Sequence, residues 1–181
     1  MNRIERRIVI DLPAGEVFDF THDLANNPLW QSTLIETQPL TEGPMRVGWR
    51  WRDVRTFLGK RIETVVEVTE YQPIARSAVK AVSGPVPFSG SYTFEPVDGG
   101  TRLTVTGELD PHGFSKLAGP LFASIASREL EANLSRLKDL LGSRSVVSAL
   151  SDERVLQGSA RGHRDQVLQS SMPSEVTESK A

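Results

Sequence analysis

Hydrophobic and polar residues alternate along most of the stretch from Thr33 to Leu109, and this period of two predicts β-strands. Segments rich in proline and glycine interrupt the alternation at the spacing of an antiparallel meander: PLTEGPM, LGK, YQP, SGPVP and VDGG. An alternating run at the start, RIERRIVIDL, predicts a further strand that reaches Ile10. Together these patterns predict a sheet of about six to seven strands.

The segment FSGSYTFEPVDGGTRLTVTGEL, residues Phe88–Leu109, predicts a hairpin that turns at VDGG. Its apolar face pairs Phe88 with Leu109, Tyr92 with Val105 and Phe94 with Leu103. On that same face Gly90 falls opposite Gly107, so two side chains are missing where the core is expected. Either the glycines let the sheet bend sharply, or they leave room for a cavity; the two interpretations are compatible.

A second hairpin is predicted in VGWRWRDVRTFLGKRIETVVEV, with its loop at Leu58-Gly59 or one residue later. Both loops place the same residues on one face: Trp49, Trp51, Asp53 and Arg55 with Ile62, Thr64, Val66 and Val68. With the first loop, Arg50 lies opposite Glu67 on the other face, as Glu95 lies opposite Arg102 in the first hairpin.

Helical patterns flank the strands. The segment PAGEVFDFTHDL predicts a short helix with Pro13 in its first turn, and ANNPLWQS predicts a turn or second short helix carrying Trp30. Near the end, apolar residues recur every three to five positions: Leu117, Leu121, Phe122, Ile125, Leu130, Leu134, Leu137 and Leu141. This stripe predicts a long helix that starts or kinks at Pro120 and ends before Gly142 as its cap.

These elements predict an α+β fold in which a curved antiparallel sheet wraps around a long C-terminal helix, with short helices after the first strand. Residues 1–142 form the predicted domain. Residues 143–181 are rich in serine and lack aromatic residues, so they are predicted to be a largely disordered tail.

The amino-acid composition excludes several classes of partner and site. A net charge of −2 over 181 residues gives no electrostatic reason to expect nucleic acid as a partner. The absence of cysteine excludes disulfides, thiolate nucleophiles and thiolate metal sites. No apolar run is long enough to span a membrane, and the charged start does not resemble a secretory signal. A cytoplasmic protein without an integral membrane segment is expected.

The chain resembles the START-like superfamily, also known as SRPBCC or the polyketide cyclase/dehydrase group, from Arg3 to Leu141, and this resemblance implies the helix-grip fold. The resemblance rests on PAGEVFDFTHDLANNPLWQS, VGWRWR, EVTEYQPIARSAV, GPVPFSGSYTFEPVDGGTRLTV and the closing helix. It implies a ligand cavity between sheet and helix, since members bind lipids, sterols, plant hormones or polyketides, and some catalyse aromatic cyclisation. The expected cavity residues are Trp30, Trp49, Trp51, Arg55, Val66, Phe88, Gly90, Tyr92, Gly107, Leu117, Leu121 and Ile125.

No catalytic constellation, metal site or cofactor motif is recognised. His22 is interpreted as a solvated or capping residue, His112 as a turn residue, and His163 lies in the predicted tail. Asp53 and Arg55 either form an ion pair at the cavity rim, turn outward at a bulge, or present Arg55 to a ligand oxygen.

Two further residues of the expected cavity leave alternatives open. The Tyr92 hydroxyl can bond Thr64, a backbone group or a ligand. Trp30 is either a core anchor or a guard of the entrance.

Three functions remain open. The first is binding of a hydrophobic small molecule, such as a lipid, polyketide or isoprenoid-like compound. The second is a polyketide cyclase or aromatase that acts on a ligand in the same cavity, in which case the activity is a cyclisation or dehydration. The third is a protein-interaction role through the tail or a sheet edge, with an unknown partner.

Overall fold

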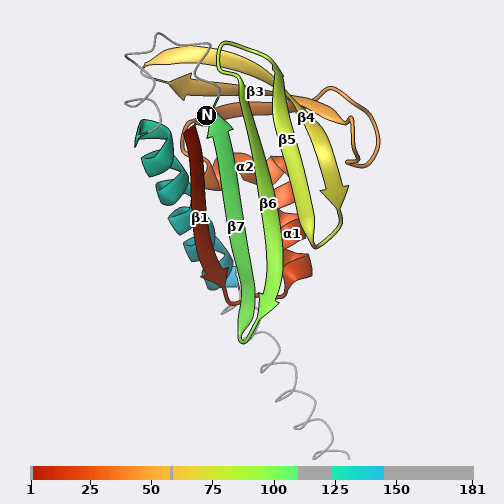
Figure 1. Cartoon of the computed structure of the whole chain (residues 1–181), viewed down its shortest axis with the longest axis vertical. Coiled ribbons are helices and arrows are strands. Elements are labelled where there is room, and N and C mark those ends of the chain that lie inside the picture. The colour runs from red at the N-terminus through yellow and green to blue at the C-terminus, as the bar shows by residue number, and fades with distance from the viewer. Residues whose placement is uncertain (1, 58, 110–123, 145–181) are drawn as a thin grey trace, which may run out of the picture. The chain divides into compact units, whose positions relative to one another are not determined.

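The computed structural model describes residues 2–57, 59–109 and 124–144. Figure 1 shows the strands, which are β1 (Asn2–Ile10), β2 (Leu34–Pro39), β3 (Arg50–Phe57), β4 (Lys60–Gln72), β5 (Arg76–Ser83), β6 (Phe88–Val97) and β7 (Gly100–Leu109). The helices between β1 and β2 are α1 (Ala14–His22), the 3-10 turn η1 (Leu24–Asn26) and α2 (Asn27–Trp30). Residues 124–144 form the C-terminal helix.

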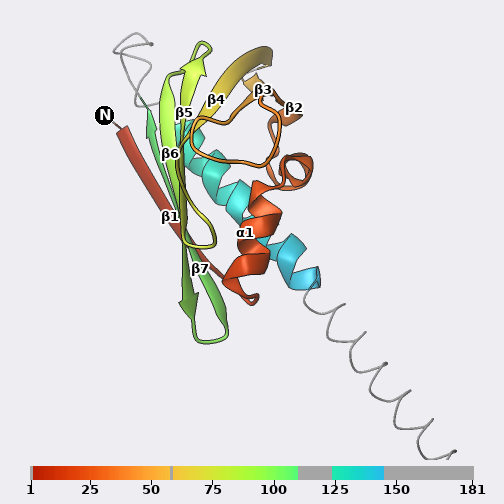
Figure 2. The same cartoon turned by 90° about the vertical axis from the view of Figure 1, so that its right-hand side faces the viewer.

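The strands form one antiparallel sheet in the order β1-β7-β6-β5-β4-β3-β2. Every neighbouring pair except β1-β7 is also consecutive along the chain, as a meander requires. The sheet curls, and Figure 2 shows α1 and the C-terminal helix on the same side of it. The predicted α+β helix-grip fold is therefore confirmed.

Both hairpins adopt the predicted register. In β6-β7, Gly90 pairs with Gly107, and the Glu95–Arg102 ion pair on the outer face measures 3.4 Å. In β3-β4, Phe57 pairs with Lys60, which selects the Leu58-Gly59 loop over the alternative. Arg50 and Glu67 then meet at 2.6 Å on the outer face. The alternation of apolar and polar residues thus identified the face of each strand correctly.

The core lies between the inner face of the sheet and the helices. Leu134, Leu137 and Leu141 of the C-terminal helix are at most 2% exposed and pack in one cluster with Phe18 and Leu103. Each fully buried leucine contributes roughly 1.5–3 kcal/mol to folding. These three leucines of the predicted stripe hold the C-terminal helix against the sheet.

The predicted end of the C-terminal helix is wrong. The helix continues through Gly142 to residue 144, and Gly142 does not take the left-handed conformation of a glycine cap. The Ser143 hydroxyl donates to the Leu140 carbonyl at 2.8 Å, which satisfies one acceptor of the last turn. The expected helix start at Pro120 and the predicted tail beyond residue 144 lie outside the described residues.

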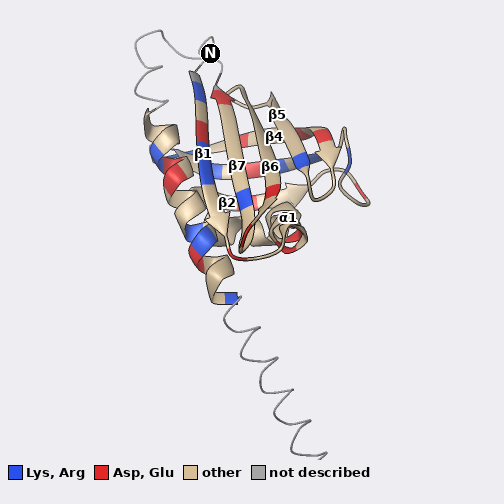
Figure 3. Ribbon diagram, turned by 60° about the horizontal axis from the view of Figure 1, so that its bottom comes forward, with Lys and Arg blue, Asp and Glu red and all other residues tan. Residues whose placement is uncertain are grey.

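Charged residues of both signs are mixed on the surface. Figure 3 shows acidic and basic positions along β1 and along the C-terminal helix. Arg6 ties these two elements together, since it donates to the Ser127 hydroxyl at 2.6 Å and lies 3.7 Å from Glu131. Within the described part of the chain, no helix is long and apolar enough to cross a membrane.

Candidate functional site

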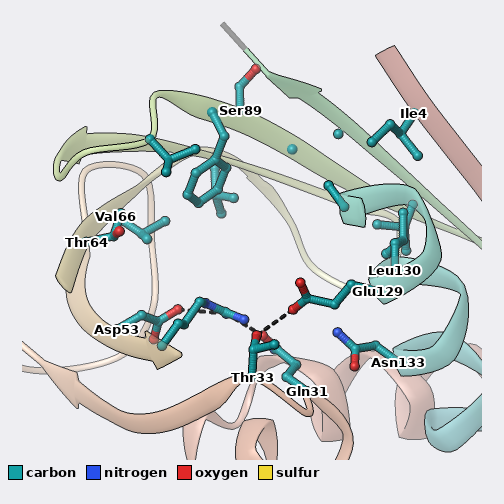
Figure 4. A pocket seen from close by; sticks show the side chains of 18 of the residues that line it. Ile4, Gln31, Thr33, Asp53, Thr64, Val66, Ser89, Glu129, Leu130 and Asn133 are labelled. Carbon is teal, nitrogen blue, oxygen red and sulfur yellow. Dashed lines mark hydrogen bonds and ion pairs between the residues drawn. The ribbon is translucent and has the colours of Figure 1, made fainter. Parts of the chain in front are cut away.

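A cavity of about 270 Å³ lies between the inner face of the sheet and the C-terminal helix. Much of its wall is apolar, and includes Ile4, Val66, Val79, Phe88, Val105 and Leu130. Figure 4 shows the labelled polar residues Gln31, Thr33, Asp53, Glu129 and Asn133 gathered along one side of it. An apolar chamber with a few grouped polar side chains is the usual form of a small-molecule site.

The glycine pair lies on this cavity's wall, and its two members differ. Among the described residues, no heavy atom lies within 4 Å of the place where a Cβ atom at Gly107 would stand, whereas a Cβ atom at Gly90 would come within 3.2 Å of the Thr106 carbonyl oxygen. Gly90 therefore permits a close approach of two strand backbones, and Gly107 leaves free volume. The sequence interpretation that the pair both shapes the sheet and spares room agrees with this geometry.

Asp53 and Arg55 form the polar centre of the site. Asp53 is only 4% exposed and pairs with Arg55 at 3.0 Å, and the same Arg55 nitrogen donates to Gln31 Oε1 at 2.5 Å. The alternative in which a bulge turns both residues outward is wrong. The β3-β4 register runs without a shift through Asp53 and Thr64, so both side chains stay on the inner face.

The C-terminal helix adds two polar side chains to this wall. Glu129 accepts a short hydrogen bond from the Thr33 hydroxyl. Asn133 is 7% exposed, and its Oδ1 accepts from the Ser32 backbone N–H at 3.0 Å and from the Ser32 hydroxyl at 3.1 Å. Sequence analysis missed both residues, because polar positions between the leucines of an amphipathic stripe are expected to face water.

Tyr92 is half-buried at the cavity wall. Burial raises the pKa of its hydroxyl; the nearby Arg55 lowers that pKa in part, and Asp53 raises it further. The hydroxyl therefore stays protonated at neutral pH. Within the described part of the chain it has no hydrogen-bond partner, and no bond to Thr64 forms.

A smaller chamber of about 90 Å³ adjoins the first. Its wall includes His22, Asn27, Trp51 and Ser77. It shares part of its lining with the larger cavity: Gln31, Asp53, Arg55, Val66, Val79, Phe88 and Tyr92. The polar centre thus separates the two chambers and faces both.

Of the two roles expected for His22, the solvated one is wrong, whereas the capping one agrees with its bond to a carbonyl of the last turn of α1. Its ring stacks on Phe18 with the ring centroids 3.9 Å apart, its Nδ1 donates to the Phe18 carbonyl at 2.8 Å, and its Nε2 accepts from the Ser77 hydroxyl at 2.8 Å. Burial lowers the pKa of His22 despite opposing effects of the Phe18 carbonyl and Asp19. The neutral imidazole therefore bridges α1 and β5.

The predicted cavity residues divide into groups. Those that line the larger cavity are Trp30, Arg55, Val66, Phe88, Gly90, Tyr92 and Gly107. Trp51 lines the smaller chamber, while Trp49 lines neither and packs beside Trp51 in a separate cluster. Ile125 sits one position before the lining residue Ala126 but is not part of the wall. Leu117 and Leu121, like His112 and His163, lie outside the described residues.

Trp30 belongs to the core as well as to the wall. It is 3% exposed within the same cluster as Leu137 and Phe18, so it packs as a core anchor. Trp30 thus contributes both to the core and to the wall of the cavity.

Several solved structures share this fold. A Thermus thermophilus protein is 20% identical, with a TM-score of 0.68 over 79% of this chain and 99% of its own. The Zhui aromatase/cyclase from a Streptomyces species is 18% identical, with a TM-score of 0.66 over 79% and 94%. The di-domain aromatase/cyclase BexL is 23% identical, with a TM-score of 0.57 over 77% of this chain and 46% of its own. At these identities the likeness shows the fold alone.

Comparison with curated protein sequences gives no significant match. A family model described as polyketide cyclase/dehydrase and lipid transport matches residues 1–142, which agrees with the resemblance to START-like proteins noted from sequence motifs. The chain therefore belongs to the polyketide cyclase/dehydrase and lipid transport family.

Proposed function

We propose that this protein binds a hydrophobic small molecule in the 270 Å³ cavity between the sheet and the C-terminal helix. The observation that carries the proposal is the free volume above Gly107 within an apolar wall. Close-packed interiors leave few voids of this size, because each void forfeits dispersion contacts. A protein that keeps such a void open and lines it with aliphatic and aromatic side chains is stabilised when an apolar ligand fills the void.

The polar centre limits what the guest can be. Asp53 and Arg55 balance each other's charge, while Glu108 and Glu129 leave an excess of acidic side chains in the lining, which disfavours an anionic ligand. The apolar residues supply the affinity, and the polar side supplies orientation. A lipid, polyketide or isoprenoid-like compound combines both properties, and each remains a possible ligand.

Two measurements test this function. Native mass spectrometry of the purified full chain should reveal an added mass from a co-purified organic molecule. Titration with N-phenyl-1-naphthylamine, a neutral apolar fluorophore, should give saturable fluorescence enhancement with one site per chain. A chain that neither retains a compound nor enhances the fluorophore would contradict the proposal.

A cyclase is the second candidate, favoured by the Tyr92 hydroxyl at the cavity wall beside Arg55 and Asp53. In aldol cyclisation of a poly-β-ketone, a methylene carbon between two carbonyls loses a proton to water and attacks a second carbonyl carbon; this forms the carbon–carbon bond, and the resulting alkoxide takes up a proton. The protonated Tyr92 can donate that proton, and the Arg55 guanidinium can stabilise the oxygen's charge.

The cyclase candidate is tested with a poly-β-ketone thioester and separation of its aromatic products. Wild-type protein should change the product pattern relative to the protein-free reaction, and Tyr92→Phe should slow that change by roughly 10²-fold or more. A product pattern that is the same with and without protein rules out this activity while leaving the binding proposal intact.

A further inference from the structure

Three buried polar atoms around the smaller chamber have no hydrogen-bond partner among the described residues: Asn27 Oδ1, Trp51 Nε1 and Asp53 Oδ1. Their side chains are 6%, 8% and 4% exposed. A buried polar atom left unpaired costs about 1–3 kcal/mol, and folded proteins seldom tolerate several together. Their gathering at one chamber of about 90 Å³ indicates a site for a polar group.

Several other polar side chains of this chamber already have partners. His22 and Ser77 bond each other at 2.8 Å. Arg55 is held by Asp53 and Gln31. The chamber therefore offers a guest the N–H donor of Trp51, oxygen acceptors on Asp53 and Asn27, and the Tyr92 hydroxyl, which can donate or accept.

Trp51 and Asp53 are two residues apart on the inner face of β3, so the donor and the acceptor are neighbours. A hydroxyl group satisfies both kinds of atom, because it donates its proton and accepts through its oxygen. A carboxylate has no proton to donate and would bring a second negative charge beside Asp53. A hydroxyl needs about the volume of one water molecule, roughly 30 Å³, which the chamber provides.

We propose that the smaller chamber recognises a neutral hydroxyl group on the ligand and discriminates against a carboxylate. This inference rests on the proposed function: the apolar body of the ligand occupies the larger cavity, and its hydroxyl reaches past Tyr92 and Phe88, which line both chambers, to Asp53 Oδ1. The ligand class is thus a phenol or alcohol with an apolar skeleton, rather than a free fatty acid.

The test compares naphthalene, 2-naphthol and 2-naphthoate as competitors of N-phenyl-1-naphthylamine on the full chain at neutral pH. The three competitors share one ring system and differ only in the polar group. Wild-type protein should bind 2-naphthol about tenfold more tightly than 2-naphthoate. In Asp53→Asn the affinity for 2-naphthol should fall and that for 2-naphthoate should rise, while naphthalene binding is unchanged.

Trp51→Phe supplies a second variant in case the loss of the Asp53 charge prevents folding. It keeps an aromatic ring but removes the Nε1 donor, so the affinity for 2-naphthol should fall about threefold to tenfold without a change for naphthalene. Trp49→Phe is the matched control, since Trp49 lines neither chamber and its Nε1 already donates to the Gly43 carbonyl at 3.2 Å. It should leave all three affinities unchanged.

The outcomes separate the two proposals. If naphthalene binds but 2-naphthol and 2-naphthoate bind equally well in wild type and in Trp51→Phe, the hydroxyl site is refuted and the apolar cavity stands. If naphthalene and the fluorophore both fail to bind, the proposed function itself is refuted.

Discussion

Gly90 and Gly107 face each other across β6 and β7, yet within the part of the chain that the structure describes Gly107 borders free space and Gly90 does not. At Gly90 the Thr106 carbonyl oxygen would lie 3.2 Å from an added Cβ, so a side chain at this position would press on the backbone of β7. The two glycines of one register pair therefore serve different purposes. One allows the strand backbones to approach closely, and the other keeps part of the cavity open.

The first prediction follows from this difference. Gly107→Val should place its methyl groups in the cavity and weaken N-phenyl-1-naphthylamine binding at least about tenfold, because guest and side chain compete for one volume. The thermal midpoint should remain within a few degrees of wild type. Thr104→Val is the control, because Thr104 lies on the same strand but lines a groove on the outer face of the sheet. This variant should bind the fluorophore as tightly as wild type. Unchanged affinity in a folded Gly107→Val protein would place the guest elsewhere.

The second prediction concerns the turn between β4 and β5. Ile74 is 51% exposed and has a φ of 68°, a conformation that β-branched residues rarely adopt, and the Ala75 N–H donates to the Gln72 carbonyl at 3.1 Å across the turn. Ile74→Gly should relieve this strain and raise the free energy of unfolding by about 1 kcal/mol, measured by urea titration. Ile74→Val keeps the branching and should bring no gain; an equal gain from valine would refute the strain explanation.

The third prediction is a pH dependence. Because burial lowers the pKa of His22 below its ordinary value of 6.5, the unfolded chain binds this proton more readily than the folded chain. Stability from His22 is therefore complete above pH 6.5 and decreases as the pH falls toward the folded-state pKa. Unfolding titrations from pH 7.5 to 5 should show this slope in wild type.

His22→Gln provides the comparison for that slope. Glutamine does not titrate, so the difference in unfolding free energy between the two proteins should shrink steadily as the pH falls below 6.5. Carboxylates contribute equally to both proteins and cancel in the difference. A difference that stays constant over this range would show that His22 titrates alike in both states.

The fourth prediction tests how the C-terminal helix is held. Asn133→Ala removes the acceptor that serves both the Ser32 N–H and the Ser32 hydroxyl, and it should lower the free energy of unfolding by roughly 1–3 kcal/mol. The exposed Ser135 lies on the same helix, and Ser135→Ala should change it by less than about 0.5 kcal/mol. Similar effects of the two substitutions would mean that Asn133 contributes no more than a surface residue.

The strands and their pairing could be predicted well, because alternation and tight turns are features of short stretches of sequence. A period of two assigns each strand residue to a face, and a tight turn sets the register, so the pairing of Gly90 with Gly107 followed from numbering alone. The apolar stripe of the C-terminal segment indicated a helix that needs a broad apolar surface, which the concave face of the sheet supplies, and the family resemblance agreed with this placement. These steps required no knowledge of individual side-chain contacts.

The site was predicted less completely because it depends on contacts between distant elements. Glu129 bonds Thr33, and Asn133 bonds Ser32, about a hundred residues earlier in the chain. No pattern within the helix indicates those partners. The position of His22 beside Asp23 near the end of a short helix predicts a solvated or capping residue, but it does not predict the contacts with Phe18 and Ser77 that half-bury its ring. Helical periodicity indicates a face, but the facing element determines burial.

The pairing of β1 with β7 has a consequence for synthesis. In the described part of the sheet, β1 pairs with β7 and with no other strand, so during synthesis β1 has no strand partner until about a hundred more residues have been made. Such distant pairing slows folding, since the intervening loop must close before any contact forms. Until β7 is made, the isoleucine and valine side chains of β1 lack the strand neighbour beside which they lie in the folded protein.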